Sequence, residues 1–346
     1  MSDVEKKVSK DDMSLEKLLG FSGLDVRKEY HAAFEQGKER LFPMVYDSAL
    51  VGLEIEVENI RRDVCFENLY WEEKEDNSLR NYGREFTSIP LRTKQVEFAM
   101  NYLREVICRQ NTPDFSPRTS VHVHLNVRDM SWNQIRTFLC LYAMFERHFF
   151  LLAGGTREKS IFCVPLYKSK QSFDIPQIEK RCTAWHKYNA INCGTICGNG
   201  NGSSMFGTIE FRHLYGTLNT KEVVDWVNNI LCLRKAAVTI PYPEIRKILE
   251  TINTTSAYLA LYRTIFGEYA RPSQMAKLDF ETCITRLKLA LWTPELKKKY
   301  KLKGESLLYT YYSSVKPKKI DPYYPKEWAT LPVFTPNVDH VQLDFN

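Results

Sequence analysis

Three carboxylates recur on alternate residues of the stretch ALVGLEIEVEN, residues 49–59. Glu54, Glu56 and Glu58 alternate with apolar residues, and this period of two predicts a β-strand with one apolar face and one acidic face. Side chains two residues apart on a strand lie about 7 Å from one another. A solvated surface strand would explain the pattern, but carboxylates clustered on a concave face repel one another unless cations lie between them.

Two further stretches, TSVHVHLNV at 119–127 and TIEFRHLYG at 208–216, show the same alternation. Their polar faces carry His122, His124 and Asn126 in the first stretch, and Glu210 and Arg212 in the second. Taken singly, a histidine pair is often structural, and Glu-x-Arg is often a surface ion pair that contributes less than about 1 kcal/mol. If the three strands share a sheet, however, its polar face combines carboxylate, imidazole and guanidinium groups.

That combination of groups is typical of phosphoryl transfer. Carboxylates with one imidazole suit Mg²⁺ or Mn²⁺, and a guanidinium holds phosphate oxygens through two parallel hydrogen bonds. The sequence has neither a Gly-x4-Gly-Lys-Ser/Thr loop nor Gly-x-Gly-x-x-Gly at a strand–helix turn, so neither common phosphate loop is used. The glycine-rich stretch at 192–207 leads into a strand and is expected to be a mobile loop. Closure of this loop over the site and simple flexibility are both open interpretations.

The cysteines do not form a recognisable framework. Nine are scattered along the chain, and no apolar leader precedes them, so we expect reduced thiols and a cytoplasmic protein, or one in the host cytoplasm if the chain is viral. Cys193 and Cys197 are four residues apart, but no second close pair completes a zinc site. No base or oxyanion motif near Cys193 supports a catalytic nucleophile there.

Composition indicates a soluble protein, and the mixture of predicted strands and helices along the chain indicates one α+β domain. The chain has 346 residues, 44% of them hydrophobic, and a formal net charge of +6, which permits an anionic ligand without indicating nucleic acid. The most apolar run, FLCLYAMFERHFFLLAG, is broken by Glu146, Arg147 and His148, so it predicts a buried helix capped by Ser131 and no membrane partner. Other helices are expected at 24–42, 93–110 (capped by Thr93), 220–238, 243–262 and 278–290.

The terminal regions differ in composition from the central part of the chain. We expect an N-terminal extension at 1–45 with one amphipathic helix, a catalytic domain at 46–300 and a proline-rich tail at 301–346. Residues 1–15 are polar and are expected to be disordered. The segment from 59 to 90 is expected to form short strands and turns, and the tail from about 314 to be extended.

Five motifs occur in an order that resembles the amidoligase family, ATP-dependent carboxylate–amine ligases with a glutamine-synthetase-like fold. They are GLEIEVE at 52–58, DNSLRNYGREFTS at 76–88, SVHVHLNV at 120–127, KYNAIN at 187–192 and TIEFRHLYGTLN at 208–219. The resemblance covers roughly residues 48–235. It implies an antiparallel half-barrel sheet with helices on its convex side.

The resemblance also implies roles for particular residues. The implied metal ligands are Glu54, Glu56, Glu85, His122 and Glu210. His124 and Arg212 match positions that face the transferring phosphate and are the implied catalytic and nucleotide-binding residues, while Lys187, Tyr188 and Asn192 match a segment that contacts nucleotide or substrate. Glu58 lies one step beyond the usual Glu-x-Glu pair, where a rim charge is the expected role.

The implied reaction uses ATP and Mg²⁺ or Mn²⁺. A substrate carboxylate attacks the γ-phosphoryl group to give an acyl phosphate, and an amine then displaces phosphate to form an amide. The partners are therefore a carboxylate and an amine, either small molecules or side chains of peptides or proteins. Two alternatives stay open: a metal-dependent phosphoesterase or nuclease, which usually has Asp-rich ligands, and a non-catalytic scaffold or virion-associated protein.

Overall fold

The computed structural model describes residues 9–21 and 49–271, with gaps at 68–69, 155–156, 167–174, 176–177, 186, 199–204 and 253. Within these ranges the side chains of residues 246 and 249–251 are not described either. The helices predicted at 24–42 and 278–290 and the proline-rich tail lie outside the described residues.

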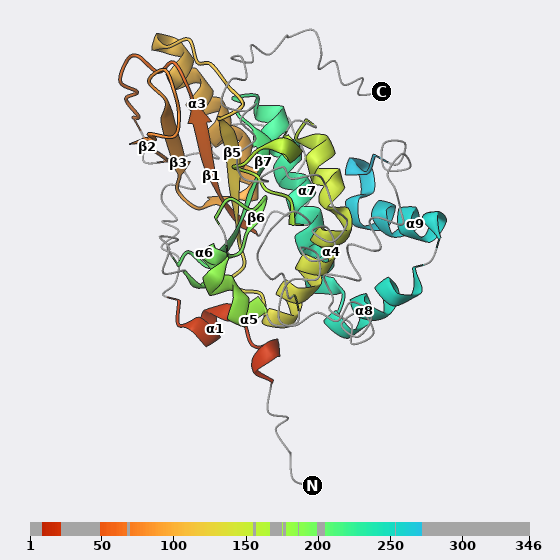
Figure 1. The fold of residues 1–346 in the computed structure, drawn as a ribbon. Helices are drawn as coiled ribbons and strands as arrows, with labels where there is room; N and C mark the ends of the chain where they lie inside the picture. The colour runs from red at the N-terminus through yellow and green to blue at the C-terminus, as the bar shows by residue number, and fades with distance from the viewer. Residues whose placement is uncertain are drawn as a thin grey trace, which may run out of the picture.

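Within the described residues, seven strands form one open antiparallel sheet in the order β2-β3-β1-β5-β7-β6, with β4 paired to β1 (Figure 1). The strands are β1 Leu50–Val57, β2 Trp71–Glu75, β3 Arg84–Ser88, β4 Leu91–Arg92, β5 Ser120–Asn126, β6 Ile191–Asn192 and β7 Thr208–Tyr215. The three alternating strands of the sequence are β1, β5 and β7, and they are neighbours in the middle of the sheet. The α+β class and the short strands expected between 59 and 90 are confirmed.

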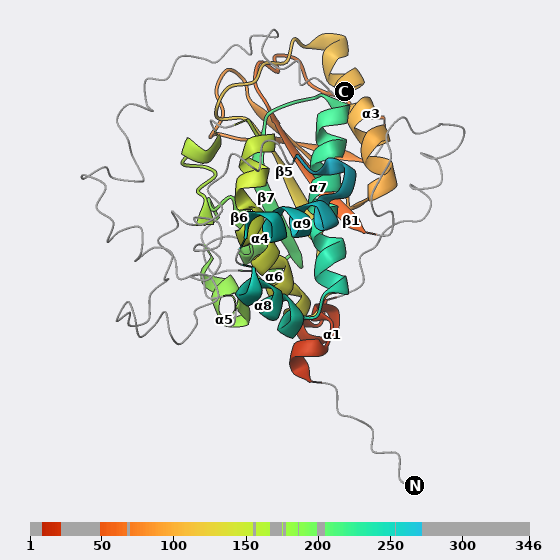
Figure 2. The ribbon, with the colours of Figure 1, turned by 90° about the vertical axis from the view of Figure 1, so that its right-hand side faces the viewer.

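Long helices cover one face of this sheet (Figures 1 and 2). They are α3 Val96–Gln110, α4 Trp132–Leu152 and α7 Thr220–Thr239, and α8 Tyr242–Thr251 and α9 Thr255–Phe266 pack beyond them. The shorter helices are α1 Leu15–Leu19, α5 Ile178–Arg181 and α6 Gly194–Cys197, together with single 3-10 turns such as η1 Lys10–Asp12, η2 Thr93–Gln95 and η6 Cys182–Ala184.

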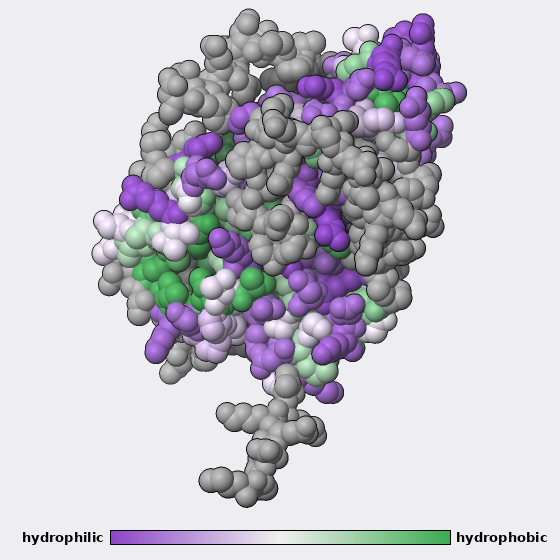
Figure 3. Space-filling view, turned by 180° about the vertical axis from the view of Figure 1, so that it is seen from behind, coloured by the Kyte–Doolittle hydropathy of each residue, from purple (hydrophilic) through white to green (hydrophobic). Residues whose placement is uncertain are grey.

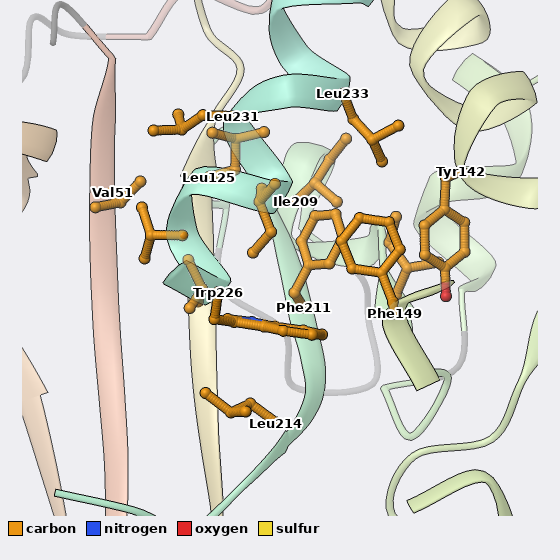
Figure 4. Packing of buried hydrophobic residues seen from close by; sticks show 14 of the residues in the cluster. Val51, Leu125, Tyr142, Phe149, Ile209, Phe211, Leu214, Trp226, Leu231 and Leu233 are labelled. Atoms are coloured by element: carbon orange, nitrogen blue, oxygen red, sulfur yellow. The ribbon is translucent and has the colours of Figure 1, made fainter. Parts of the chain in front are cut away.

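The apolar faces of the three central strands form the core under the helices. Figure 4 shows Leu125, Ile209 and Phe211 of β5 and β7 packed against Trp226 of α7 and Phe149 of α4. These side chains are at most 2% exposed. Burying a large apolar side chain contributes roughly 1.5–3 kcal/mol, so this layer holds the opposite, polar face of the sheet in a fixed register.

The apolar run in the middle of the chain forms α4, a buried helix as predicted. Ser131 caps it: its Oγ accepts a hydrogen bond from Gln134 N at 3.3 Å, and its own N–H donates to Gln134 Oε1 at 2.9 Å. Glu146 is buried and accepts hydrogen bonds from the Tyr142 hydroxyl and from Leu166 N. In the part of the chain that the structure describes, no helix has the length and apolar content to cross a membrane.

Most of the described surface seen from behind is hydrophilic (Figure 3). A hydrophobic area lies on the side where Figure 1 places α8 and α9. On α9, Leu259 and Leu261 are half-buried and pack against the core, so part of their apolar surface is already covered.

Three sequence expectations need correction. The helix predicted at 243–262 is two helices, because Thr254 begins a new one by accepting a hydrogen bond from Ala257 N at 3.2 Å. Thr93 does not cap α3; it starts the 3-10 turn η2, and α3 begins at Val96. Residues 10–19 are ordered as η1 and α1, because Leu15 is buried and its N–H donates to Met130 O at 2.8 Å.

His148 of α4 lies in the helical layer and is built into it as a neutral imidazole. Its Nε2 lies 2.8 Å from Asn229 Oδ1 and its Nδ1 lies 2.9 Å from the Tyr262 hydroxyl, which accepts from Arg271 N. Burial lowers the pKa of His148 to about 4, with a smaller contribution from the nearby charge of Arg271. Protonation would require a charge in this layer and would break the hydrogen bond that Nδ1 accepts.

The depressed pKa predicts a loss of stability in mild acid. The unfolded chain takes up a proton below about pH 6.5, whereas the folded chain does so only near pH 4. The stabilisation is therefore present above the unfolded pKa and is lost as pH falls. We expect wild type to lose about 2 kcal/mol more unfolding free energy than His148→Gln between pH 7 and pH 5. Urea unfolding at both pH values measures this difference; equal losses in the two proteins would contradict it.

Candidate functional site

The register of the sheet brings the predicted polar side chains onto one face. Glu54 of β1 pairs with His122 of β5, and Glu56 pairs with Glu85 of β3. On the other side of β5, His124 pairs with Glu210 of β7. Residues paired across antiparallel strands point to the same face, so these groups line the face opposite the helices. The sheet therefore brings together residues that are up to 156 positions apart, from Glu54 to Glu210.

One group of metal-type ligands consists of Glu54, His124 and Glu210, whose ligand atoms all lie within 4.8 Å of one another. His124 Nε2 is 3.0 Å from Glu54 Oε1, and its Nδ1 is 3.0 Å from the hydroxyl of Thr208. Thr208 was not predicted as a site residue, although it lies on the polar face of β7, two residues before Glu210. Because both imidazole nitrogens face protein oxygens, the ring has a fixed orientation.

A second group consists of Glu56, Glu85 and Asp76, again with ligand atoms within 4.8 Å of one another. Asp76 was not predicted as a site residue, although it opens the motif at 76–88. It lies in the turn after β2, where strand alternation does not apply. Its position at the start of a turn, with its Oδ1 accepting from Ser78 N at 2.8 Å, is the one local signal.

His122 lies between the two groups. Its Nδ1 is 3.0 Å from Glu54 Oε2 and 3.5 Å from Glu210 Oε1, and its Nε2 is 3.8 Å from Glu56 Oε1. The Ser120 hydroxyl donates to Glu56 Oε2 at 2.6 Å and lies 2.8 Å from His122 Nε2. Ser120 was missed by the sequence analysis, although it precedes His122 by two residues and so shares its face. Both histidines therefore contact Glu54, and His122 also lies close to one carboxylate of the second group.

The carboxylates of this face differ in their proton affinity. Burial alone would raise the pKa of Glu54, but the charge of His124 and hydrogen bonds from His122 and His124 outweigh it and hold that pKa well below its usual range. Burial, together with the neighbouring charge of Glu54, raises the pKa of Glu85 to about 7. Glu85 therefore takes up a proton below neutral pH when no cation offsets the negative charges around it.

Arg212 is paired with Glu210. Its Nη1 donates to Glu210 Oε1, and its Nε donates to Phe162 O at 3.3 Å. Burial alone would lower the pKa of Arg212, but the negative charges of Glu210 and Glu56 outweigh it and raise that pKa. Burial alone would raise the pKa of Glu210, but the positive charge of Arg212 outweighs it and lowers that pKa. The structure thus places a permanently charged guanidinium at the edge of the first ligand group.

A β-bulge interrupts the alternation of β7 just after Arg212, which itself keeps the polar-face position expected two residues after Glu210. Val121 pairs with Leu214 and Val123 pairs with Phe211, so Arg212 and His213 together face the single residue between the two valines. His213 and Leu214 are both buried, and Figure 4 shows Leu214 beside Trp226 in the core. The sequence analysis assumed strict alternation along this strand and did not predict the bulge.

Arg157 supports the bulge from outside the sheet. Its side chain donates to Arg212 O at 2.8 Å and to His213 O at 2.9 Å. It is 4% exposed, so these two carbonyls have little access to water. Arg157 therefore satisfies the backbone acceptors of the two bulge residues and holds the backbone from which Arg212 projects.

Removal of the Arg157 guanidinium should destabilise the fold. We expect Arg157→Met to lower the unfolding free energy by about 3 kcal/mol, because buried carbonyl groups without a partner cost about 1–3 kcal/mol each. The measurement is denaturant unfolding at pH 7. Arg109→Met is the matched control, since Arg109 is an exposed arginine paired with Glu105 on α3, and it should unfold close to wild type. Equal stability of both variants would show that the bulge does not depend on Arg157.

Glu58 does not act as a rim charge. It is 1% exposed, and its Oε1 accepts hydrogen bonds from Arg80 N at 2.9 Å and from the Ser116 hydroxyl at 3.1 Å. Its backbone pairs with Asp114. The rim expectation fails because the strand ends at Val57, and the loops on either side fold over the next residue. The third carboxylate of the opening motif therefore holds two loops together.

Of the segment Lys187, Tyr188 and Asn192, the structure brings Asn192 to the ligand groups. Asn192 Nδ2 donates to Glu210 Oε2 at 2.8 Å, and its Oδ1 accepts from Gly194 N at 2.9 Å. Lys187 is exposed, and its Nζ lies 4.9 Å from the centre of the Tyr188 ring. The Tyr188 ring lies against the ring of Phe162, whose carbonyl accepts from Arg212.

A groove of about 760 Å³ lies elsewhere, between α1, the start of α4 and the turn from α7 to α8. Its lining includes Lys17, Asp129, Ser131 and Tyr242. It contains none of the polar-face residues described above, and its volume alone indicates no chemistry.

The polar face fits divalent cations of the magnesium type. Its two ligand groups offer five carboxylates and one imidazole, the oxygen-rich donor set that suits Mg²⁺ or Mn²⁺. The raised pKa of Glu85 is the expected mark of carboxylates gathered without a compensating charge. In addition, Thr87 Oγ1 is buried and has no hydrogen-bond partner among the described residues, and Thr87 pairs with Glu54.

No protein-family model matches the chain, and no curated protein sequence matches it. One solved structure that matches is described as that of a novel glutamine synthase homolog. It has a TM-score of 0.35 and 12% sequence identity, and the match covers 69% of this chain and 70% of that chain. A similarity of this size supports no conclusion about activity.

Proposed function

We propose that this protein is an ATP- and Mg²⁺-dependent carboxylate–amine ligase of the amidoligase type, built on a glutamine-synthetase-like sheet. The observation that carries the proposal is the single polar face on which two groups of metal-type ligands lie side by side with Arg212, a half-buried arginine. The five motifs that resemble the amidoligase family supply most of these residues.

Two cations would be held by the two ligand groups. Glu54, His124 and Glu210 would hold one, and Glu56, Glu85 and Asp76 the other, with His122 placed between them. Bound Mg²⁺ would neutralise polyphosphate oxygens and polarise the phosphorus–oxygen bond that breaks. The protein's own contribution is the fixed spacing of its carboxylates, which the register of β1, β3, β5 and β7 sets.

Arg212 is the residue we assign to charge stabilisation during phosphoryl transfer. Its side chain is only 14% exposed at the edge of the first ligand group, and its backbone is held by Arg157. Its pairing with Glu210 keeps the guanidinium charged and oriented before substrate binds. When Glu210 binds a cation, the cation and Arg212 share its negative charge. The guanidinium of Arg212 can then donate hydrogen bonds to phosphate oxygens.

His124 and the segment around Asn192 complete the assignment. His124 is oriented by Thr208 and Glu54, which suits a group that must meet a phosphate or a cation in one geometry. Asn192 holds the second oxygen of Glu210. We assign Lys187 and Tyr188 to the edge of the nucleotide or substrate site, because Tyr188 contacts Phe162 beside Arg212.

The decisive assay measures ADP release from ATP and Mg²⁺ with panels of carboxylates and amines, added separately and together. A ligase releases ADP and phosphate in amounts that depend on both co-substrates and forms the corresponding amide, which mass spectrometry detects. Hydrolysis of phosphoesters or nucleic acid without an amine would instead support the phosphoesterase alternative. No turnover with any pair, together with absence of Mn²⁺ and ATP binding, would support a non-catalytic scaffold.

A further inference from the structure

Two cysteines 15 residues apart in the sequence, with Asn192 between them, lie against each other. The thiol of Cys182, in the 3-10 turn η6, donates to Cys197 Sγ at the end of α6, with the two sulfur atoms 2.9 Å apart. A disulfide bond is about 2.05 Å long, so the sulfurs need to approach by less than about 1 Å. All the cysteines that the structure describes are free thiols.

The two thiols differ in the way that disulfide chemistry requires. Cys197 is half-buried, whereas Cys182 is fully buried. The hydrogen bond from Cys182 lowers the pKa of Cys197, and the same hydrogen bond together with burial raises the pKa of Cys182. The accessible thiol is therefore the better nucleophile, and its partner stays protonated beside it. The neighbouring Cys193 is buried, and burial raises its pKa well above the usual value.

We propose that Cys182 and Cys197 are a redox pair that forms a reversible disulfide when the protein meets a hydroperoxide. The Cys197 thiolate attacks one peroxide oxygen; the O–O bond breaks, and Cys197 becomes a sulfenic acid as hydroxide or alkoxide leaves. The Cys182 thiol then attacks the Cys197 sulfur, the S–O bond breaks, and water leaves with the thiol proton. In total, two thiols and one hydroperoxide give one disulfide, one water and one further water or alcohol.

The disulfide would close a loop that contains part of the polar face. Cys182 and Cys197 are 15 residues apart, and Tyr188 and Asn192 lie between them. Asn192 donates to Glu210, and Thr195 of α6 donates to Thr208 O at 2.7 Å. Oxidation therefore ties down the segment that contacts Glu210 and the start of β7. The proposal concerns thiol chemistry alone and does not depend on the ligase assignment.

The test is peptide mapping of the purified full chain after treatment with hydrogen peroxide or dithiothreitol. Free thiols are alkylated before digestion, and mass spectrometry then identifies cross-linked peptides. We expect peroxide to produce the Cys182–Cys197 peptide and dithiothreitol to remove it. Cys193→Ser is the matched control, a buried thiol of the same segment whose loss should leave the cross-link intact. In Cys182→Ser, Cys197 should instead be recovered as sulfenic or higher oxidised species.

The melting temperature gives a second test for the disulfide. Closing the loop restricts the unfolded chain, so oxidised wild type and oxidised Cys193→Ser should melt above their reduced forms. Cys182→Ser should show no such rise. The proposal is overturned if both cysteines remain available to the alkylating agent after peroxide treatment. It is also overturned if Cys197 pairs with another cysteine, or if it reaches sulfinic acid in wild type without forming the cross-link.

Discussion

Replacement of Glu54 or Glu210 with glutamine is expected to lower Mg²⁺-dependent ATP turnover about 1000-fold, a barrier increase of about 4 kcal/mol. Glutamine keeps the shape of the side chain but removes the negative charge that would hold the cation with His124. Because each carboxylate is shared among several partners on the polar face, we expect the loss to appear mainly in kcat. Steady-state ADP release with the co-substrates found in the panel assay measures it.

A matched control lies on the same strand. Glu58→Gln is the same chemical change, four residues after Glu54 in the same alternating pattern. Glu58, however, accepts hydrogen bonds from Arg80 N and Ser116 instead of joining a ligand group. Glutamine can still accept these two hydrogen bonds, so turnover should stay within a few-fold of wild type. Turnover near wild type in both Glu54→Gln and Glu210→Gln, with both proteins folded, would refute the metal assignment.

Arg212→Lys is expected to slow turnover by about 100- to 1000-fold while ATP affinity changes only a few-fold. Lysine keeps the positive charge but cannot reproduce the planar fork that donates to Glu210 and Phe162 at once. Loss of one oriented donor at a developing negative charge costs about this much in other enzymes. Equilibrium binding of a nucleotide analogue, compared with kcat, separates the two effects.

Arg84→Lys provides the corresponding control on β3. Arg84 is a strand arginine that donates to Glu73 at 2.8 Å, in an ion pair outside the two ligand groups. Its replacement should change neither ATP affinity nor kcat appreciably. If Arg212→Lys turns over as fast as Arg84→Lys, then Arg212 serves only to pair with Glu210, and the transition-state role must be withdrawn.

Alternation along the strands predicted most of the polar face. Glu54, His122 and Glu210 could be placed together because a period of two fixes which face a strand residue occupies, and the core needs the other face. The period of two does not predict which strands pair with which. In the structure β1, β5 and β7 are adjacent, because each has a fully buried apolar face that must lie in the middle of the sheet.

The residues that were missed lie where the period does not hold. Asp76 reaches Glu56 and Glu85 from a turn, and turn side chains have no periodic direction. The bulge at Arg212 and His213 breaks the period of β7, and its support comes from Arg157, which is 55 residues before Arg212 in the sequence. Such contacts join residues that are distant in the sequence, so the local sequence pattern does not predict them.

Short ordered segments were also hard to predict from composition. The polar stretch before residue 15 forms η1 and leads into α1 because two backbone hydrogen bonds, to Met130 O and Arg128 O, attach it to the turn before α4. Leu15 is buried in the core, and Leu18, Leu19 and Phe21 pack against that core. Likewise, the break between α8 and α9 depends on a single threonine cap at Thr254.

The most direct test of the proposed site is a Mn²⁺ titration of the purified chain at pH 8 without nucleotide, followed by electron paramagnetic resonance of free Mn²⁺. This pH lies above the pKa of Glu85, about 7, so its carboxylate is available for binding. The two ligand groups predict two bound ions per chain, and one ion in either Glu85→Gln or Glu210→Gln. No bound Mn²⁺ in wild type, or the same stoichiometry in wild type and both variants, would contradict the assignment of this polar face as a two-cation site.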